Sequence, residues 1–299
     1  MTSCREALDP TQAAQKHALV VDSGPDINEL LDDVFERDGW SVRRVPDNQA
    51  VLSLVAASPF DLIVTSRKTL GSEDLELLHK IRGVRPHLRL IILTDQFTPG
   101  DVISAMREGA FSYFSAPFQP AELAEMVRAA MAEPCWDDGI ELLSATPAWI
   151  RLIARCEIAT ANRLVQFLRG VKDPNIPDED REDIIAAFSE ILLNAMEHGA
   201  NFDASQYVEI AFVRTRRAVV CRVKDPGQGF SLDEIRHAAV NSSPGDLLGH
   251  VAVREAQGLR PGGFGVLLAK GLVDELIYGE KGNDVLLIKY LQPTPSQAA

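Results

Sequence analysis

Residues 189–199 read Ser-Glu-Ile-Leu-Leu-Asn-Ala-Met-Glu-His-Gly, and this stretch decides the fold of the second half of the chain. Glu190, Asn194 and His198 stand at positions i, i+4 and i+8, so in a helix they lie on one face. The residues between them are mostly apolar and can face a core. An amide oxygen beside a carboxylate suits Mg²⁺, which proteins bind with few ligands of their own plus nucleotide phosphates. The polar row therefore predicts a binding face on a helix.

Two glycine-containing motifs follow this helix along the chain. Asp225-Pro-Gly227-Gln-Gly229 comes directly after a predicted strand, where a carboxylate can accept a hydrogen bond from a base and glycines allow close backbone approach. Residues 260–265, Arg-Pro-Gly-Gly-Phe-Gly, open a predicted helix, and backbone N–H groups at such a start form an anion site suited to phosphates. Either motif alone is commonly a turn or a helix cap. All three motifs in this order are specific to a nucleotide site.

The order E-x-x-x-N-x-x-x-H, D-x-G-x-G, G-x-G resembles the Bergerat-fold (GHKL) ATP-binding domain over about residues 149–291. Histidine kinases, gyrase-type ATPases and anti-sigma-factor serine kinases share this domain, and the stretch SEILLNAMEHG is closest to the anti-sigma kinases. The resemblance implies that ATP and Mg²⁺ bind, with Asn194 as the magnesium ligand. It implies that Glu190 is the base that activates the attacking hydroxyl or water, and that Asp225 contacts adenine. The glycines implied beside the base are Gly227 and Gly229, and those beside the phosphates are Gly263 and Gly265.

Apolar strands and amphipathic helices surround these motifs. The predicted strands cover residues 149–156, 206–214 and 217–224, and two more close the domain on either side of Glu-Lys-Gly-Asn-Asp. The predicted helices cover residues 157–170, 178–199 and 263–273, and Asp178 is the predicted N-cap of the second one. Helices gathered against an antiparallel sheet predict an α+β sandwich. By the resemblance, residues 231–262 form the ATP lid.

The first half alternates five short apolar runs with five helix-like segments. The runs are His17–Asp22, Trp40–Val45, Phe60–Thr65, Leu88–Thr94 and Phe111–Ser115. The helix-like segments lie near residues 26–38, 48–57, 72–83, 99–109 and 120–132. This alternation predicts an α/β domain with a five-stranded, doubly wound parallel sheet, whose ligand site lies at the carboxyl ends of the strands.

Residues 17–132 resemble a response-regulator receiver domain, most clearly in HALVVD, DLIVTS, IILT and GAFSYFSAPFQPAEL. Asp22 matches one of the two acids after the first strand of that family, and Thr94 matches the hydroxyl after the fourth. The second acid, the acceptor Asp and the Lys of the family pattern are replaced by Ser23, Ser66 and Ala116. Aspartyl phosphorylation needs a carboxylate nucleophile and a metal that neutralises the phosphoryl charge. We therefore predict a pseudo-receiver, folded but not phosphorylated on Asp; a ligand in the pocket or a modification of Ser66 is the alternative.

Length and composition fit this division. The 299 residues predict an N-terminal tail (1–16), a pseudo-receiver (17–132), a linker (133–148), an ATP-binding domain (149–291) and a tail (292–299). A net charge of −13 argues against a nucleic-acid partner, because duplex binding depends on Lys and Arg that neutralise phosphates. Four scattered cysteines, the lack of a signal-peptide pattern and the lack of a long apolar run predict a cytoplasmic protein without a membrane partner.

Two functions remain open at this point. None of the six histidines lies between residues 88 and 197, where a histidine kinase carries its phosphorylated His, so histidine autophosphorylation is excluded. The first hypothesis is a bacterial signalling regulator with a serine/threonine kinase of the anti-sigma type, which acts on a STAS-type anti-anti-sigma factor or a sigma factor. The second is an ATP-dependent binding switch or scaffold without turnover. Retention of Glu190 favours the enzyme. The resemblance to the receiver and GHKL families, which commonly dimerise, also implies a possible homodimer.

Overall fold

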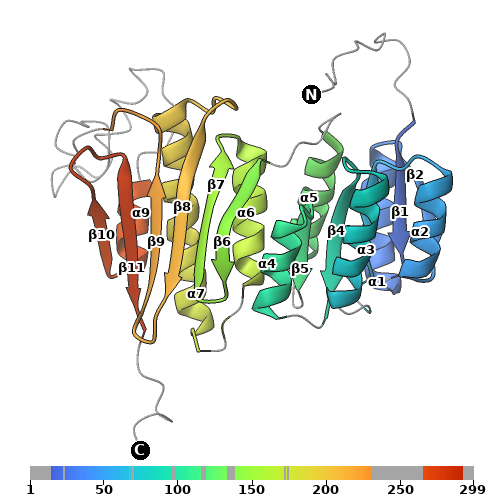
Figure 1. The fold of residues 1–299 in the computed structure, drawn as a ribbon, viewed down its shortest axis with the longest axis horizontal. Helices are drawn as coiled ribbons and strands as arrows, with labels where there is room; N and C mark the ends of the chain where they lie inside the picture. Colours follow the sequence, from blue (N-terminus) through green and yellow to red (C-terminus); the bar gives the residue numbers. More distant parts are fainter. Residues whose placement is uncertain are drawn as a thin grey trace, which may run out of the picture. The chain divides into compact units, whose positions relative to one another are not determined.

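The computed structural model describes residues 15–22, 24–66, 68, 71–95, 98–115, 119–132, 139–171, 173, 175–229 and 265–291. They form two compact units that divide after residue 138, and each is described by itself (Figure 1). Ser23, Ala116, Gly263 and the predicted lid lie outside the described residues. No helix in the described ranges is both long and apolar enough to cross a membrane.

The first unit is a parallel sheet between two layers of helices. Its strands are β1 (His17–Val21), β2 (Ser41–Val45), β3 (Leu62–Val64), β4 (Arg89–Thr94) and β5 (Ser112–Ser115), in the order β2-β1-β3-β4-β5. All four pairings are parallel. Its helices are α1 (Pro25–Arg37), α2 (Asn48–Ala57), α3 (Gly71–Val84), α4 (Pro99–Arg107) and α5 (Pro120–Ala132). The predicted doubly wound α/β fold is confirmed.

Continuous apolar runs and helix caps explain these elements. β1 after its first residue and all of β3 and β4 are buried, as expected for parallel strands that are covered on both faces. Asp47 caps α2 by accepting a hydrogen bond from the Ala50 N–H at 2.9 Å. Thr98 and Asp101 form a reciprocal capping box at the start of α4. Because all four strand pairings are parallel, the carboxyl ends of the strands, and the loops after them, lie at one edge of the sheet.

The second unit is an antiparallel sheet with helices packed on one face. Its strands are β6 (Ile140–Thr146), β7 (Trp149–Arg155), β8 (Tyr207–Arg214), β9 (Ala218–Lys224), β10 (Glu275–Tyr278) and β11 (Asp284–Tyr290), in the order β10-β11-β9-β8-β7-β6. Its helices are α6 (Ile158–Gly170), α7 (Asp178–Asn194), the π-helix η1 (Ala195–Gly199) and α9 (Gly265–Leu272). Along β7, Ile150, Leu152 and Ala154 are buried and alternate with more exposed residues. The predicted α+β sandwich is confirmed.

Two local predictions in this unit are wrong. The segment predicted as a linker over residues 133–148 contains β6, which pairs with β7 through Ile140–Thr146. β6 is an edge strand with several exposed side chains and a register shift between Leu142 and Ser144, so its alternation is broken. Asp178 is the first residue of α7, and Pro177 occupies the N-cap without a side-chain cap bond. Three acids in the first turn stabilise this helix end through its dipole instead.

Lys289 of β11 joins α7 to the end of α9. Its Nζ donates to Asp183 Oδ2 of α7 at 2.8 Å and to the Leu272 carbonyl at the end of α9 at 2.9 Å. α9 therefore lies along α7 with its last turn fixed, and its first residue, Gly265, faces the other end of α7.

Candidate functional site

The polar row of α7 ends in a π-helical turn. Glu190 and Asn194 are half-buried on the last α-helical turn, and Ala195–Gly199 continue as η1. His198 lies within η1 and is exposed, whereas Glu190 and Asn194 form a half-buried pair before it. Such π turns occur frequently at functional sites.

Gly265, the first residue of α9, lies directly against this pair. A Cβ atom at Gly265 would stand 2.6 Å from Glu190 Oε2 and 3.3 Å from Asn194 Nδ2. A larger residue there would displace the ends of these two side chains from the start of α9. The first and third sequence motifs, which are separated by more than sixty residues, therefore meet at one place.

Asp225 follows β9 and meets the end of η1. Its Oδ1 accepts a hydrogen bond from the Gly227 N–H at 2.8 Å. A Cβ atom at Gly199 would lie 2.4 Å from Asp225 Oδ1, and one at Gly227 would lie 2.8 Å from the Gly199 carbonyl oxygen. The first motif therefore also touches the second, through its final glycine.

Gly229 packs on the hairpin between β10 and β11. Its φ of +80° belongs to the left-handed region, and a Cβ atom there would stand 1.6 Å from the Lys281 carbonyl oxygen. Asn283 of the same hairpin donates through Nδ2 to the carbonyl oxygens of Asp225 and Gly227, at 3.2 and 3.0 Å. No sequence motif links this hairpin to residues 225–229, so it is expected only to join two strands.

The electrostatics of Asp225 suit an acceptor for a ligand. Loss of solvent raises the pKa of its carboxyl above the ordinary value, the Gly227 N–H opposes this shift, and the charge on Asp284 adds to it. A half-buried carboxylate with few donors gains from a further N–H group supplied by a ligand. An exocyclic amino group of a base is such a donor.

Asn194 and Glu190 are the residues of this site that can hold a nucleotide-bound Mg²⁺. No group of three or more His, Cys, Asp or Glu side chains in the described part of the chain is placed to hold a metal ion. Mg²⁺ at nucleotide sites commonly needs only one or two protein ligands, with phosphates and water supplying the rest. Rotation about its Cβ–Cγ bond lets Asn194 present Oδ1 where Nδ2 now faces Gly265, so the two residues fit a nucleotide-bound Mg²⁺.

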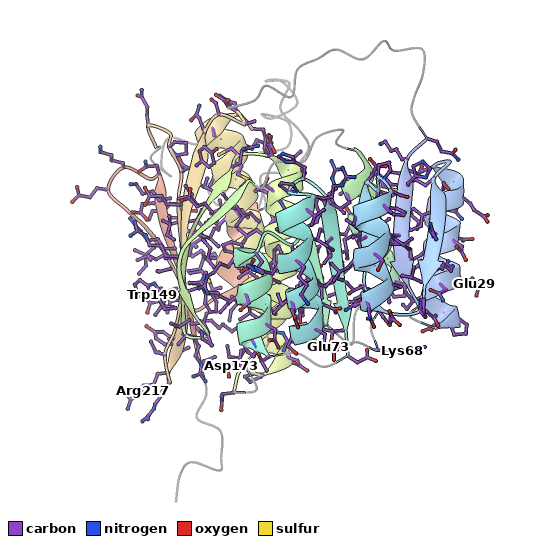
Figure 2. All side chains as sticks on the ribbon, turned by 45° about the vertical axis from the view of Figure 1, so that its right-hand side comes forward. Glu29, Lys68, Glu73, Trp149, Asp173 and Arg217 are labelled. Atoms are coloured by element: carbon purple, nitrogen blue, oxygen red, sulfur yellow. The ribbon has the colours of Figure 1, made fainter. Side chains whose placement is uncertain are left out.

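A second polar cluster lies at the carboxyl edge of the first unit, after β1 and β3. Ser66 is buried, and its hydroxyl donates to the Asp22 carbonyl at 2.6 Å and accepts from the Lys68 N–H at 3.1 Å. The Lys68 ammonium, labelled in Figure 2, lies 4.0 Å from Asp22 Oδ2. Hydrogen bonds from the Gly24 N–H and from Asn28, together with this ammonium, lower the pKa of Asp22. Thr94 is buried at the end of β4.

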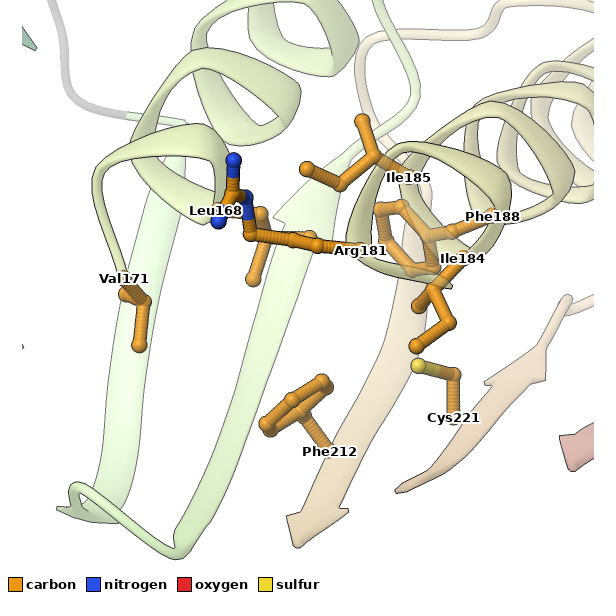
Figure 3. Close-up of a pocket in the computed structure, with 8 residues that line it drawn as sticks. All are labelled: Leu168, Val171, Arg181, Ile184, Ile185, Phe188, Phe212 and Cys221. Carbon is orange, nitrogen blue, oxygen red and sulfur yellow. The ribbon is translucent and has the colours of Figure 1, made fainter. Parts of the chain in front are cut away.

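An apolar cavity of about 30 Å³ lies between α6, α7 and the strands β8 and β9 (Figure 3). Phe188, Phe212 and the free thiol of Cys221 contribute to its lining. Burial raises the pKa of Cys221 to about 12, so the thiol is protonated and unreactive at neutral pH. The cavity also borders Arg181, which is near the start of α7. Glu190 and Asn194 lie at the other end of this helix. It is a packing gap apart from the site.

Two family models match the chain. Residues 18–128 match the response regulator receiver domain, and residues 154–289 match the histidine kinase-like ATPase domain. The chain therefore contains both domains, and Glu190, Asn194, Asp225 and Gly265 all lie within the second match.

Individual relatives cover one part of the chain. The chain is 31% identical over 116 residues to the DNA-binding transcriptional regulator NtrC of Rhizobium meliloti. The matched region covers 39% of this chain and 24% of that protein. The chain is also 28% identical over 111 residues to sporulation initiation phosphotransferase F of Bacillus subtilis. That matched region covers 37% of this chain and 89% of the relative. A response regulator structure from Thermotoga maritima has 22% identity and a TM-score of 0.35, covering 40% of this chain and all of that one. The chain spans about a quarter of the length of the NtrC relative.

Proposed function

We propose that this chain is a bacterial signalling regulator whose second domain is an ATP- and Mg²⁺-dependent serine/threonine kinase of the anti-sigma-factor type. The two domains support a role in signalling. One observation carries the kinase assignment: the Glu190 carboxylate lies beside Asn194 at the glycine start of α9. A base, an amide that suits Mg²⁺ and a phosphate-binding helix start then share one place.

Each residue has a distinct part in this reaction. The start of α9 binds the phosphates, and Asp225 accepts a hydrogen bond from the 6-amino group of adenine. Bound Mg²⁺, held by Asn194, supplies positive charge against the phosphate oxygens. Glu190 takes the proton of a Ser or Thr hydroxyl on the partner. That hydroxyl oxygen bonds to the γ-phosphorus while the bond from phosphorus to the bridging oxygen breaks, and ADP leaves.

The proposed substrate is a STAS-type anti-anti-sigma factor, with a sigma factor as a further binding partner. This proposal rests on the likeness of residues 189–199 to the anti-sigma kinases. Incubation with γ-³²P-ATP, Mg²⁺ and a purified STAS protein from the same genome tests it. We expect label on a Ser or Thr of that protein.

The alternative is an ATP-dependent switch that binds a partner without turnover. The contact between Glu190 and Gly265 favours it, because a carboxylate at a helix start also stabilises that helix through its dipole. The two functions differ in one respect: a switch binds ATP and changes its partner affinity, but leaves the γ-phosphate in place.

We propose further that the receiver is not phosphorylated on Asp, since Ser66 stands at the acceptor position and its hydroxyl is held by Asp22 and Lys68. Incubation with ³²P-acetyl phosphate and Mg²⁺ should leave residues 17–132 unlabelled, whereas a receiver with an acceptor Asp takes up label under the same conditions. Alkali-labile label on Asp22 would contradict this prediction.

Gly265→Ala should reduce ATP affinity by about tenfold or more, because a methyl group there displaces the Glu190 carboxylate and crowds Asn194. Gly271→Ala on the same helix is the matched control, since a Cβ atom at Gly271 meets nothing within 4 Å. That control should bind ATP normally and gain about 0.5–1 kcal/mol in stability. Calorimetric titration of both variants checks this, and equal ATP affinities would remove α9 from the site.

A further inference from the structure

We infer that Asn283 is a positioning residue for base recognition, which holds the Asp225 loop so that the site discriminates adenine from guanine. The inference rests on the proposed ATP site. Asn283 lies 58 residues after Asp225 in the sequence, in the hairpin between β10 and β11.

Three hydrogen bonds join Asn283 to the loop. The Asp225 N–H donates to the Asn283 carbonyl oxygen at 3.0 Å. The Asn283 side chain returns two bonds, from Nδ2 to the Asp225 carbonyl at 3.2 Å and to the Gly227 carbonyl at 3.0 Å. Asn283 therefore holds the backbone N–H and the carbonyl of Asp225 as well as the carbonyl of Gly227.

The side-chain chemistry of asparagine suits this task. An amide NH₂ has two N–H groups and can serve two carbonyl oxygens at once, whereas a carboxylate has none and a hydroxyl has one. The hairpin that carries it is itself braced: the Gly279 N–H donates to Asp284 at 2.7 Å, and Arg222 Nε donates to Asp284 Oδ1 at 2.8 Å. Gly229 adds a close backbone contact at Lys281.

The direction of the Asp225 carboxylate follows from these bonds. Its Oδ1 is oriented by the Gly227 N–H, and Gly227 is held in turn by Asn283. Adenine presents an amino group at position 6, which donates to a carboxylate, and guanine presents a carbonyl oxygen there, which is repelled. A site that fixes its acceptor rejects the wrong base strongly, because the buried acceptor is then left without a donor. A loose acceptor can turn away and tolerates guanine.

The test measures ATP and GTP affinities of the full chain in Mg²⁺, for wild type, Asn283→Ala, Asn283→Asp and the control Glu280→Ala. Glu280 is exposed in the same hairpin. We expect wild type and Glu280→Ala to prefer ATP by about 100-fold or more. Both Asn283 variants should lose about tenfold of this preference.

The ratio of the two affinities separates positioning from stability. Both nucleotides are titrated into one preparation, so a partly unfolded variant lowers both signals and leaves the ratio unchanged. If Asn283 has only a structural role, both variants should melt at a lower temperature and keep the wild-type ratio of ATP to GTP affinity. That result would overturn this inference and leave the proposed ATP site intact. A wild-type chain that binds neither nucleotide would overturn the proposed ATP site and this inference together.

Discussion

Glu190→Gln is expected to slow phosphate transfer to the partner by about 10²–10⁴-fold, which is the contribution of a general base. Glutamine keeps the length of the side chain that contacts Gly265, but its amide does not accept a proton at neutral pH. ATP affinity should therefore stay close to that of wild type. Single-turnover transfer from γ-³²P-ATP and calorimetric ATP titration measure the two quantities on the same preparation.

Glu182→Gln is the matched control on the same helix. Glu182 is exposed and pairs with Arg169 at 3.0 Å, three turns before Asn194. Loss of such a surface ion pair costs at most about 1 kcal/mol, so transfer should continue at the wild-type rate. Wild-type transfer by Glu190→Gln would show that Glu190 is not the base. Loss of ATP binding together with transfer would indicate that Glu190 shapes the helix start instead.

Asn194→Ala should abolish the Mg²⁺-dependent part of ATP binding. Removal of the proposed protein ligand should lower ATP affinity in Mg²⁺ by at least about 10–100-fold, the scale seen when support of a metal site is lost. In EDTA the variant and wild type should bind ATP alike, because the amide then has no metal to bind. Titrations with and without Mg²⁺ give the four affinities that are needed.

Ser189→Ala provides the comparison for this variant. It removes a hydroxyl group from α7 next to Glu190. Because neighbouring residues in a helix point in different directions, Ser189 does not share the face of Glu190 and Asn194. It should keep the Mg²⁺ dependence of wild type. An Asn194→Ala chain with unchanged ATP affinity in Mg²⁺ would contradict the assignment of Asn194.

The sequence predicted the first domain well because β1, β3, β4 and β5 are buried along nearly their whole lengths. Runs such as His17–Asp22 and Leu88–Thr94 have continuous apolar centres and are separated by amphipathic helices, so both the elements and their order could be predicted. β6 was missed because it is an edge strand: exposed Glu141 and Ser144 and a shift in register hide its alternation. An edge strand such as β6 buries few side chains, so its sequence shows little alternation of apolar and polar residues.

In the second domain the motifs located the site residues but not the contacts between them. Glu190, Asn194 and Asp225 could be named from spacing, and the structure brings Gly265 and Gly199 against them. No motif marks the π turn Ala195–Gly199, because the predicted helix over residues 178–199 runs through it. Asn283 could not be found because its partners are set by the pairing of β9 with β11.

Transfer of the γ-phosphate to a protein hydroxyl tests the kinase assignment most directly. Wild-type chain, γ-³²P-ATP and Mg²⁺ are mixed with each STAS-domain protein of the source genome, and label is located by phosphopeptide mapping. We expect label on one Ser or Thr of such a protein, and this label should depend on Mg²⁺ and be absent with Glu190→Gln. A wild-type chain that binds ATP and labels none of these proteins would contradict it.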